Sequence, residues 1–164
     1  MPAARNSLAI QSTAGTSFEA SLSFLICALG NKLSVSAERD LRKRLDVSLM
    51  EWRVLAVLAA EPAAPPGRII AIAGVNKAAV SRAVNSLEHR KLLRRVAATD
   101  HGLRTHLFLT AAGLRLHRRG EGARLRGERL LLQGMTANER TRLISLLKKI
   151  MRNFDRADQE LRPL

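Results

Sequence analysis

The sequence predicts a mainly α-helical chain with one small β-hairpin, and three features support this fold class. Capping-box pairs open several stretches in which apolar residues recur at helical spacing. One segment after residue 90 changes to short strand-like runs around a polar loop that contains glycine. Before it, residues 76–90 predict a helix with one apolar and one cationic face. This order is that of a winged helix-turn-helix lobe with flanking helices.

The chain is strongly basic, which indicates a polyanionic partner. Its 28 lysines and arginines against 14 acidic residues give a net charge of +14, and the excess is densest around residues 68–106. Nucleic acid is the first candidate partner, and an anionic membrane surface is the second. No apolar run approaches the ~18 residues of a membrane span, and the N-terminus lacks a secretory pattern. We therefore expect a cytoplasmic location. Because nucleic acid is the preferred partner, we expect no membrane partner.

The N-terminal region is predicted to be a loose arm followed by a long helix. Residues 1–15 mix small and polar types without sustained periodicity. Thr16 and Glu19 then stand at capping-box spacing, so the helix is expected to begin near Ser17, with a break near Gly30 as an open alternative. The first half of this helix is apolar, and it therefore needs a partner surface.

Two shorter helices are expected next. Ser48 and Glu51 form a second capping box, which opens a core helix that ends before Pro62. Pro66 suits the first position of a new helix, and Gly74 ends that helix. Together with the helix that follows, this segment has the order of a helix-turn-helix unit.

The helix predicted over residues 76–90 has two different faces. One is an apolar stripe of Val80, Ala83, Val84 and Leu87. The other is short or cationic and contains Lys77, Ala78, Ser81, Arg82 and Asn85. A DNA groove could approach such a face closely, and its polar side chains could bond base edges. We interpret it as a recognition helix; the alternative is an ordinary amphipathic helix with a solvated polar side.

A hairpin and two further helices are expected after this helix. The runs LLRRV and LRTHLFL flank a polar loop and predict the wing. Thr110 begins a helix with four internal glycines, each of which weakens it by about 1 kcal/mol relative to alanine. Thr136 and Glu139 supply the third capping box, for a last helix whose narrow stripe suits helix packing: Leu143, Leu146, Leu147, Ile150 and Phe154.

The succession LDVSLMEWRVLAVLA, NKAAVSRAVNSLEHRKLLRRV and RTHLFLTAAG resembles the MarR family of bacterial transcription regulators, over roughly residues 33–115. The resemblance implies a homodimer that represses genes from palindromic sites on double-stranded DNA. It also implies release by a small-molecule effector, often an aromatic acid. The implied division is an arm (1–15), a helical dimerisation region (16–46 and 111–164) and a winged helix-turn-helix DNA-binding domain (47–110).

The basic residues outside the predicted recognition helix divide into two groups. Arg68, Arg94 and Arg95 are better placed for phosphates or structure than for base reading. Arg104, with His101, is predicted to enter the adjacent minor groove. Two positions depart from the family pattern: Lys91 replaces a usual glycine, and the wing sequence TDHGLRTH replaces the usual aspartate and first arginine with His101 and Leu103.

No constellation in the sequence indicates an enzyme, so no catalytic residues and no cofactor are expected. His89, His101, His106 and His117 are scattered over different predicted elements, which favours surface histidines over a metal site. Cys27 cannot form an internal disulfide, because it is the only cysteine. Its apolar setting favours a buried, inert thiol, and a redox-sensing regulator is the alternative.

An effector pocket is predicted only in outline. Phe24 and Trp52 could line it, although aromatic residues on apolar helix faces are usually plain core. Arg39, Arg42 or Arg44 could hold a carboxylate there, against the alternative of plain surface charge. Two rival functions also remain: an architectural DNA binder with little sequence preference, and a scaffold whose winged helix contacts protein.

Overall fold

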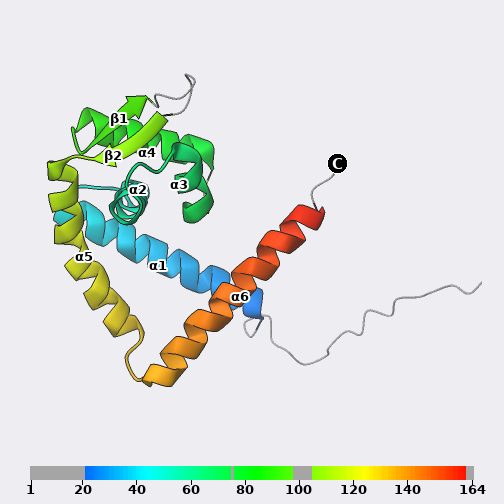
Figure 1. The fold of residues 1–164 in the computed structure, drawn as a ribbon. Helices are drawn as coiled ribbons and strands as arrows, with labels where there is room; N and C mark the ends of the chain where they lie inside the picture. Colours follow the sequence, from blue (N-terminus) through cyan, green and yellow to red (C-terminus); the bar gives the residue numbers. More distant parts are fainter. Residues whose placement is uncertain (1–20, 75, 98–104, 162–164) are drawn as a thin grey trace, which may run out of the picture. The chain divides into compact units, whose positions relative to one another are not determined.

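The computed structural model describes residues 21–74, 76–97 and 105–161. It contains six helices and one antiparallel pair of strands in these residues (Figure 1). Their bounds are α1 (Leu22–Leu45), α2 (Leu49–Ala60), α3 (Pro66–Ala73), α4 (Lys77–His89), β1 (Leu93–Ala97), β2 (Thr105–Leu109), α5 (Ala111–Leu131) and α6 (Ala137–Leu161). The predicted fold class, mainly helical with a two-stranded wing, is confirmed.

Two compact units divide the chain, Met1–His117 and Arg118–Leu164. The first contains the helix-turn-helix and the wing, and α2 lies at its centre. This helix contacts α1, α3, α4 and β2 (Figure 1). A helix surrounded in this way must be apolar on most sides, and five of its side chains are buried hydrophobics: Trp52, Val54, Leu55, Val57 and Leu58.

Local signals set the ends of the helices in the first unit. The Ser48 hydroxyl accepts a hydrogen bond from the Glu51 amide at 3.1 Å, and the Glu51 carboxylate accepts one from the Ser48 amide at 2.6 Å. This is the predicted capping box. Pro66 is the first residue of α3, and Gly74 ends that helix with a left-handed φ of 61°. The predicted boundaries of α2 and α3 are thus confirmed.

The start of α1 differs from the prediction. Ser21 has extended backbone angles and caps a helix that begins at Leu22, later than the predicted start near Ser17. The proposed capping residues Thr16 and Glu19, like the predicted arm, lie outside the described residues. A break near Gly30 is wrong, because α1 is continuous to Leu45. One glycine weakens a helix by only about 1 kcal/mol, which a long helix tolerates.

The wing is an antiparallel hairpin in the predicted place. Its register runs from Leu93 opposite Leu109 to Ala97 opposite Thr105. The loop between the strands, residues 98–104, lies outside the described residues. Leu93 and Leu107 point into the core and are fully buried, whereas other strand positions are exposed or half-buried.

One residue, Thr110, separates α5 from the hairpin, and one glycine of α5 is required there. A Cβ atom on Gly113 would lie 2.0 Å from the backbone oxygen of Leu92, so no larger residue fits. The Thr110 hydroxyl donates to the Lys91 carbonyl at 2.8 Å and accepts from the Gly113 amide at 3.1 Å. These contacts fix the start of α5 against the turn after α4. As predicted, the helix continues through its remaining glycines.

The second unit holds the end of α5 and all of α6. The Thr136 hydroxyl accepts from the Glu139 amide at 3.3 Å, and the Glu139 carboxylate accepts from the Thr136 amide at 2.8 Å, which confirms the third capping box. Large apolar side chains of α6 are exposed in the single chain: Ile144, Leu146, Leu147, Met151 and Phe154. In the described part of the chain, no helix is long and apolar enough to cross a bilayer.

Candidate nucleic-acid interface

The two faces of α4 have the environments that the sequence predicts. Val80, Ala83, Val84 and Leu87 are buried in the core of the first unit. All five residues of the opposite face are exposed: Lys77, Ala78, Ser81, Arg82 and Asn85. The Asn76 side chain accepts a hydrogen bond from the Ala79 amide at 2.8 Å and so caps the helix. The helix therefore presents its cationic face to the surface; its base contacts stay a prediction.

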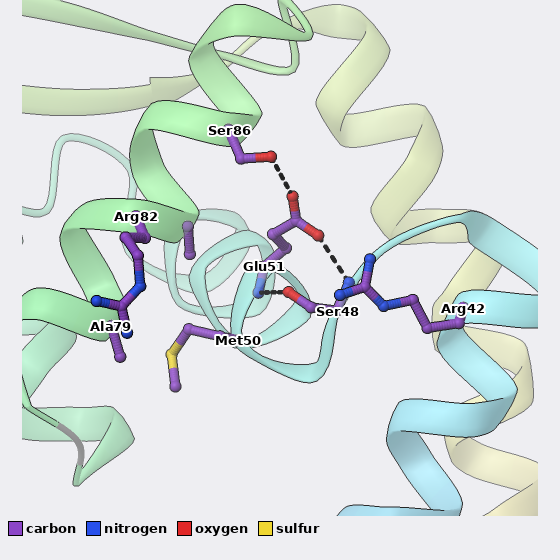
Figure 2. A pocket seen from close by; sticks show the side chains of 8 residues that line it. Arg42, Ser48, Met50, Glu51, Ala79, Arg82 and Ser86 are labelled. Carbon is purple, nitrogen blue, oxygen red and sulfur yellow. Dashed lines mark hydrogen bonds between the residues drawn. The ribbon is translucent and has the colours of Figure 1, made fainter.

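A buried carboxylate holds α4 against α2. Glu51 is only 5% exposed, and it accepts a hydrogen bond from the Ser86 hydroxyl at 2.6 Å in addition to its capping bonds with Ser48 (Figure 2). A guanidinium nitrogen of Arg90 lies 3.6 Å from the same carboxylate. Burial acts to raise the pKa of Glu51, but the hydrogen bonds from Ser86 and Ser48 outweigh it, so its pKa is lowered. Glu51 is thus a charged residue that sets the position of α4 against α2.

The C-terminal end of α4 is a Schellman turn with an unusual residue. Leu92 donates its amide to the Leu87 carbonyl, and Lys91 donates to the Glu88 carbonyl, both at 2.8 Å. Lys91 has a φ of 56°, in the left-handed region that glycine adopts without penalty. Lysine at this position, where the family that the sequence resembles has glycine, therefore strains the backbone beside the recognition helix.

Two predicted interface residues contact each other. Arg95 on β1 donates from Nη2 to Oδ1 of Asn85 on α4. Its Nε lies 3.0 Å from an oxygen of Glu88, one helical turn further along α4. Sequence reasoning assigned Asn85 to bases and Arg95 to phosphates or structure, and it missed their contact. Residues ten positions apart on different elements give no periodic signal of such a contact.

The other two predicted phosphate-binding arginines also have protein partners. Arg68 on α3 makes two hydrogen bonds of 2.9 Å to Glu61. Arg94 on β1 lies over the ring of Phe108, 4.9 Å from its centroid. Both side chains remain exposed, so these contacts orient them without removing them from the surface. The predicted wing residues His101 and Arg104 lie outside the described residues.

A pocket of about 300 Å³ opens beside α4, between that helix, the start of α2 and the end of α1. Figure 2 shows Arg42 and Arg82 on opposite sides of it, with Met50 between them. Arg42 pairs with Glu38 at 2.8 Å, whereas Arg82 has no acidic partner within the described residues. The Glu51 carboxylate and the hydroxyls of Ser48 and Ser86 also line this pocket, so it carries charges of both signs. Of the arginines Arg39, Arg42 and Arg44, Arg42 is the one that lines the pocket beside α4.

The two predicted effector-pocket residues differ in their surroundings. Trp52 is 6% exposed and belongs to the core, where its ring stacks on His117 with centroids 5.1 Å apart. Phe24 is half-buried near the start of α1. Trp52 thus fits the alternative of plain core, and an effector pocket that includes both residues stays a prediction.

The prediction that Cys27 is buried is wrong for the single chain, because its side chain is exposed. Four apolar side chains in the first half of α1 are exposed as well: Leu22, Leu25, Ile26 and Leu29. Within the described ranges, no group of three or more His, Cys, Asp or Glu side chains could hold a metal ion. His106 has a structural contact, since its Nδ1 lies 2.7 Å from the Ala63 carbonyl oxygen.

Comparisons with known proteins agree with this geometry. The MarR family model matches residues 45–102, from the end of α1 into the wing. The chain is similar to a MarR/EmrR family transcriptional regulator from Acinetobacter sp. ADP1, with 28% identity and a TM-score of 0.77 over 82% of this chain and 94% of that one. A search of curated proteins found no match.

Two more distant structures share the fold. One is MepR of S. aureus in complex with DNA, with 20% identity and a TM-score of 0.73 over 84% of this chain and 99% of that one. The other is PcaV of Streptomyces coelicolor in complex with its natural ligand, with 23% identity and a TM-score of 0.70 over 84% of this chain and 96% of that one. At these identities the likeness concerns the fold alone.

Proposed function

Because this chain belongs to the MarR family of DNA-binding transcription regulators, we propose that it is a homodimeric repressor of a palindromic operator. The observation that supports this most directly is the exposed cationic face of α4, held in place by the buried Glu51. Sequence-specific DNA binding fits this geometry, because base reading requires a helix that is held in a fixed position. The family consists of regulators, which agrees with the expectation that the chain is not an enzyme.

The contacts that we propose follow the face of α4. Arg82 and Asn85 contact base edges, Lys77 and Ser81 are shared between bases and phosphates, and Ala78 lets the groove approach closely. In a two-fold dimer the two copies of α4 would lie about 34 Å apart, one turn of DNA, which is why a palindrome is expected. Around them, Arg68 and Arg94 hold phosphates, and His101 with Arg104 enters the minor groove.

We propose that dimerisation uses the flanking helices, residues 16–46 and 111–164. The support is the uncovered apolar surface of both regions: Leu22, Leu25, Ile26, Leu29 and Leu33 on α1, and Ile144, Leu146, Leu147, Met151 and Phe154 on α6. Contiguous exposed apolar surface of this kind marks an interaction site. The proposed division between a dimerisation region and a winged helix-turn-helix domain (47–110) is supported by the same observation, whereas the proposed arm (1–15) lies outside the described residues.

The effector that we propose is a small, often aromatic, acid that releases the protein from DNA. PcaV, which shares the fold, was solved with its natural ligand. The candidate residues are Phe24 and Trp52 for the apolar part, with an arginine near the end of α1 for the carboxylate. We expect the regulator to act in the cytoplasm.

A selection from random duplexes, followed by titration at two salt concentrations, tests this function. A sequence-specific repressor is expected to enrich one palindrome at least about a thousandfold and to lose affinity steeply with salt. An architectural binder would show the salt dependence without the preference, and a protein-binding scaffold would show neither. Sedimentation of the free protein checks the dimer: a monomer at all concentrations contradicts the proposal.

A further inference from the structure

The contact between Asn85 and Arg95 fixes which way the amide of Asn85 faces. A guanidinium has only donors, so the atom of Asn85 that it contacts must be the carbonyl oxygen Oδ1. The Nδ2 amino group therefore lies on the other branch of the side chain. Glu88 holds Arg95 in this place through its contact with Nε at 3.0 Å. Glu88, Arg95 and Asn85 form a chain of contacts between β1 and α4. These contacts set which side of the Asn85 amide carries the oxygen and which side carries the nitrogen.

This orientation changes what Asn85 can recognise. A free asparagine commonly pairs with adenine, because it accepts from the N6 amino group and donates to N7. In this protein Arg95 already uses an acceptor position of Oδ1, which reduces the capacity of this oxygen to accept from a second donor such as N6. The Nδ2 group, in contrast, still has donors for a base. Asn85 thus favours acceptors over donors.

We propose that Arg95 is a specificity-determining residue, which makes Asn85 select guanine and reject adenine. Guanine presents two neighbouring acceptors in the major groove, O6 and N7, and no donor there. Adenine presents the N6 donor, which would face either the amino group of Asn85 or the guanidinium of Arg95. Arg95 acts through Asn85 and is therefore distinct from a phosphate contact. This inference rests on the proposed sequence-specific binding of DNA.

The test compares selected operators for three variants with that of the parent protein. Asn85→Ala identifies the base pair that Asn85 contacts, because this variant loses the sequence preference at that pair. In the parent, this pair is expected to be G·C. Arg95→Ala frees the amide, so the preference for G·C at this pair is expected to fall about tenfold, with a gain for A·T, while other positions keep theirs.

Arg94→Ala is the matched control, because Arg94 is also an exposed arginine of β1 but contacts Phe108 and not Asn85. It is expected to weaken all sequences alike and to leave this base pair unchanged. A second measurement changes the DNA and compares the parent protein with Asn85→Ala. Replacing the guanine with 7-deazaguanine removes the N7 acceptor and should weaken the parent about tenfold but leave Asn85→Ala unaffected.

The outcomes separate this inference from the proposed function. An enriched palindrome with A·T at the Asn85-dependent pair overturns the inference and leaves the function standing. The same holds if Arg95→Ala keeps the G·C preference of the parent. A parent protein that enriches no sequence overturns both proposals.

Discussion

α4 and α6 are both amphipathic helices, yet they differ in what covers their apolar faces. On α4 the apolar stripe is buried in the core, and Leu87 is 0% exposed. On α6 the corresponding side chains are uncovered, and Leu147 is 41% exposed in the single chain. The same sequence pattern therefore marks an internal face in one helix and an external one in the other. Periodicity identifies an apolar face, but it does not identify the surface that covers it.

The largest effect is expected when a leucine in either apolar stripe is replaced by alanine. Leu87→Ala leaves a cavity in the core of the first unit and should lower the free energy of unfolding by about 2–5 kcal/mol. Thermal unfolding, followed by the fluorescence of the buried Trp52, measures this loss. The loss should appear at every protein concentration tested, because the contacts are within one chain.

Leu147→Ala is the matched substitution on α6. If α6 packs against a second copy, the loss depends on protein concentration, and sedimentation shifts toward the monomer. A variant that stays dimeric at low concentration, with unchanged stability, would contradict a dimer interface on this stripe. If both variants lost the same stability at every protein concentration, the apolar faces of α4 and α6 would both be covered within one chain.

Glu51 gives a smaller, pH-dependent effect that concerns the attachment of α4 alone. Glu51→Gln replaces the carboxylate with a neutral amide, which weakens the hydrogen bonds that the carboxylate accepts. The variant should lower the free energy of unfolding of the first unit by about 1–3 kcal/mol near neutral pH. The folded-state pKa of Glu51 is lowered, so its contribution is present above the ordinary glutamate pKa and is lost as the pH falls through the folded value. Unfolding titrations of both proteins, repeated from neutral to acidic pH, should therefore converge. A difference that persists at low pH would mean that the carboxylate charge is not involved.

Arg82 tests the exposed face of α4 without disturbing its buried face. Arg82→Ala should reduce affinity for the selected operator by about 1–3 kcal/mol and relax the preference at one base pair per half-site. Its stability should stay within about 0.5 kcal/mol of the parent, since the removed side chain is exposed and has no acidic partner among the described residues. A uniform loss on all duplexes would reassign Arg82 to a phosphate.

Elements with local signals could be predicted from the sequence, and contacts between distant residues could not. The capping boxes at Ser48 and Thr136 lie within four residues of chain, so spacing alone identifies them. The bond from Ser86 to Glu51 joins residues 35 positions apart, and only the packing of α4 on α2 brings them together. The exposure of Cys27 was mispredicted for a related reason, because an apolar run does not show whether its cover is in the same chain.

The smallest expected effect concerns two turns that share a left-handed conformation but differ in residue. After α4 the position is occupied by Lys91 with a φ of 56°, and before α6 by Gly134 with a φ of 85°. A non-glycine residue in the left-handed conformation is strained by about 1–2 kcal/mol. Glycine avoids this strain, but its greater conformational freedom in the unfolded chain offsets part of the gain in stability. Lys91→Gly should therefore stabilise the protein by about 0.5–1 kcal/mol, and Gly134→Ala should destabilise it by a similar amount. Chemical denaturation of the two variants measures the change in the free energy of unfolding and its sign. If Lys91→Gly were destabilised, the lysine side chain would make a contact that outweighs the strain.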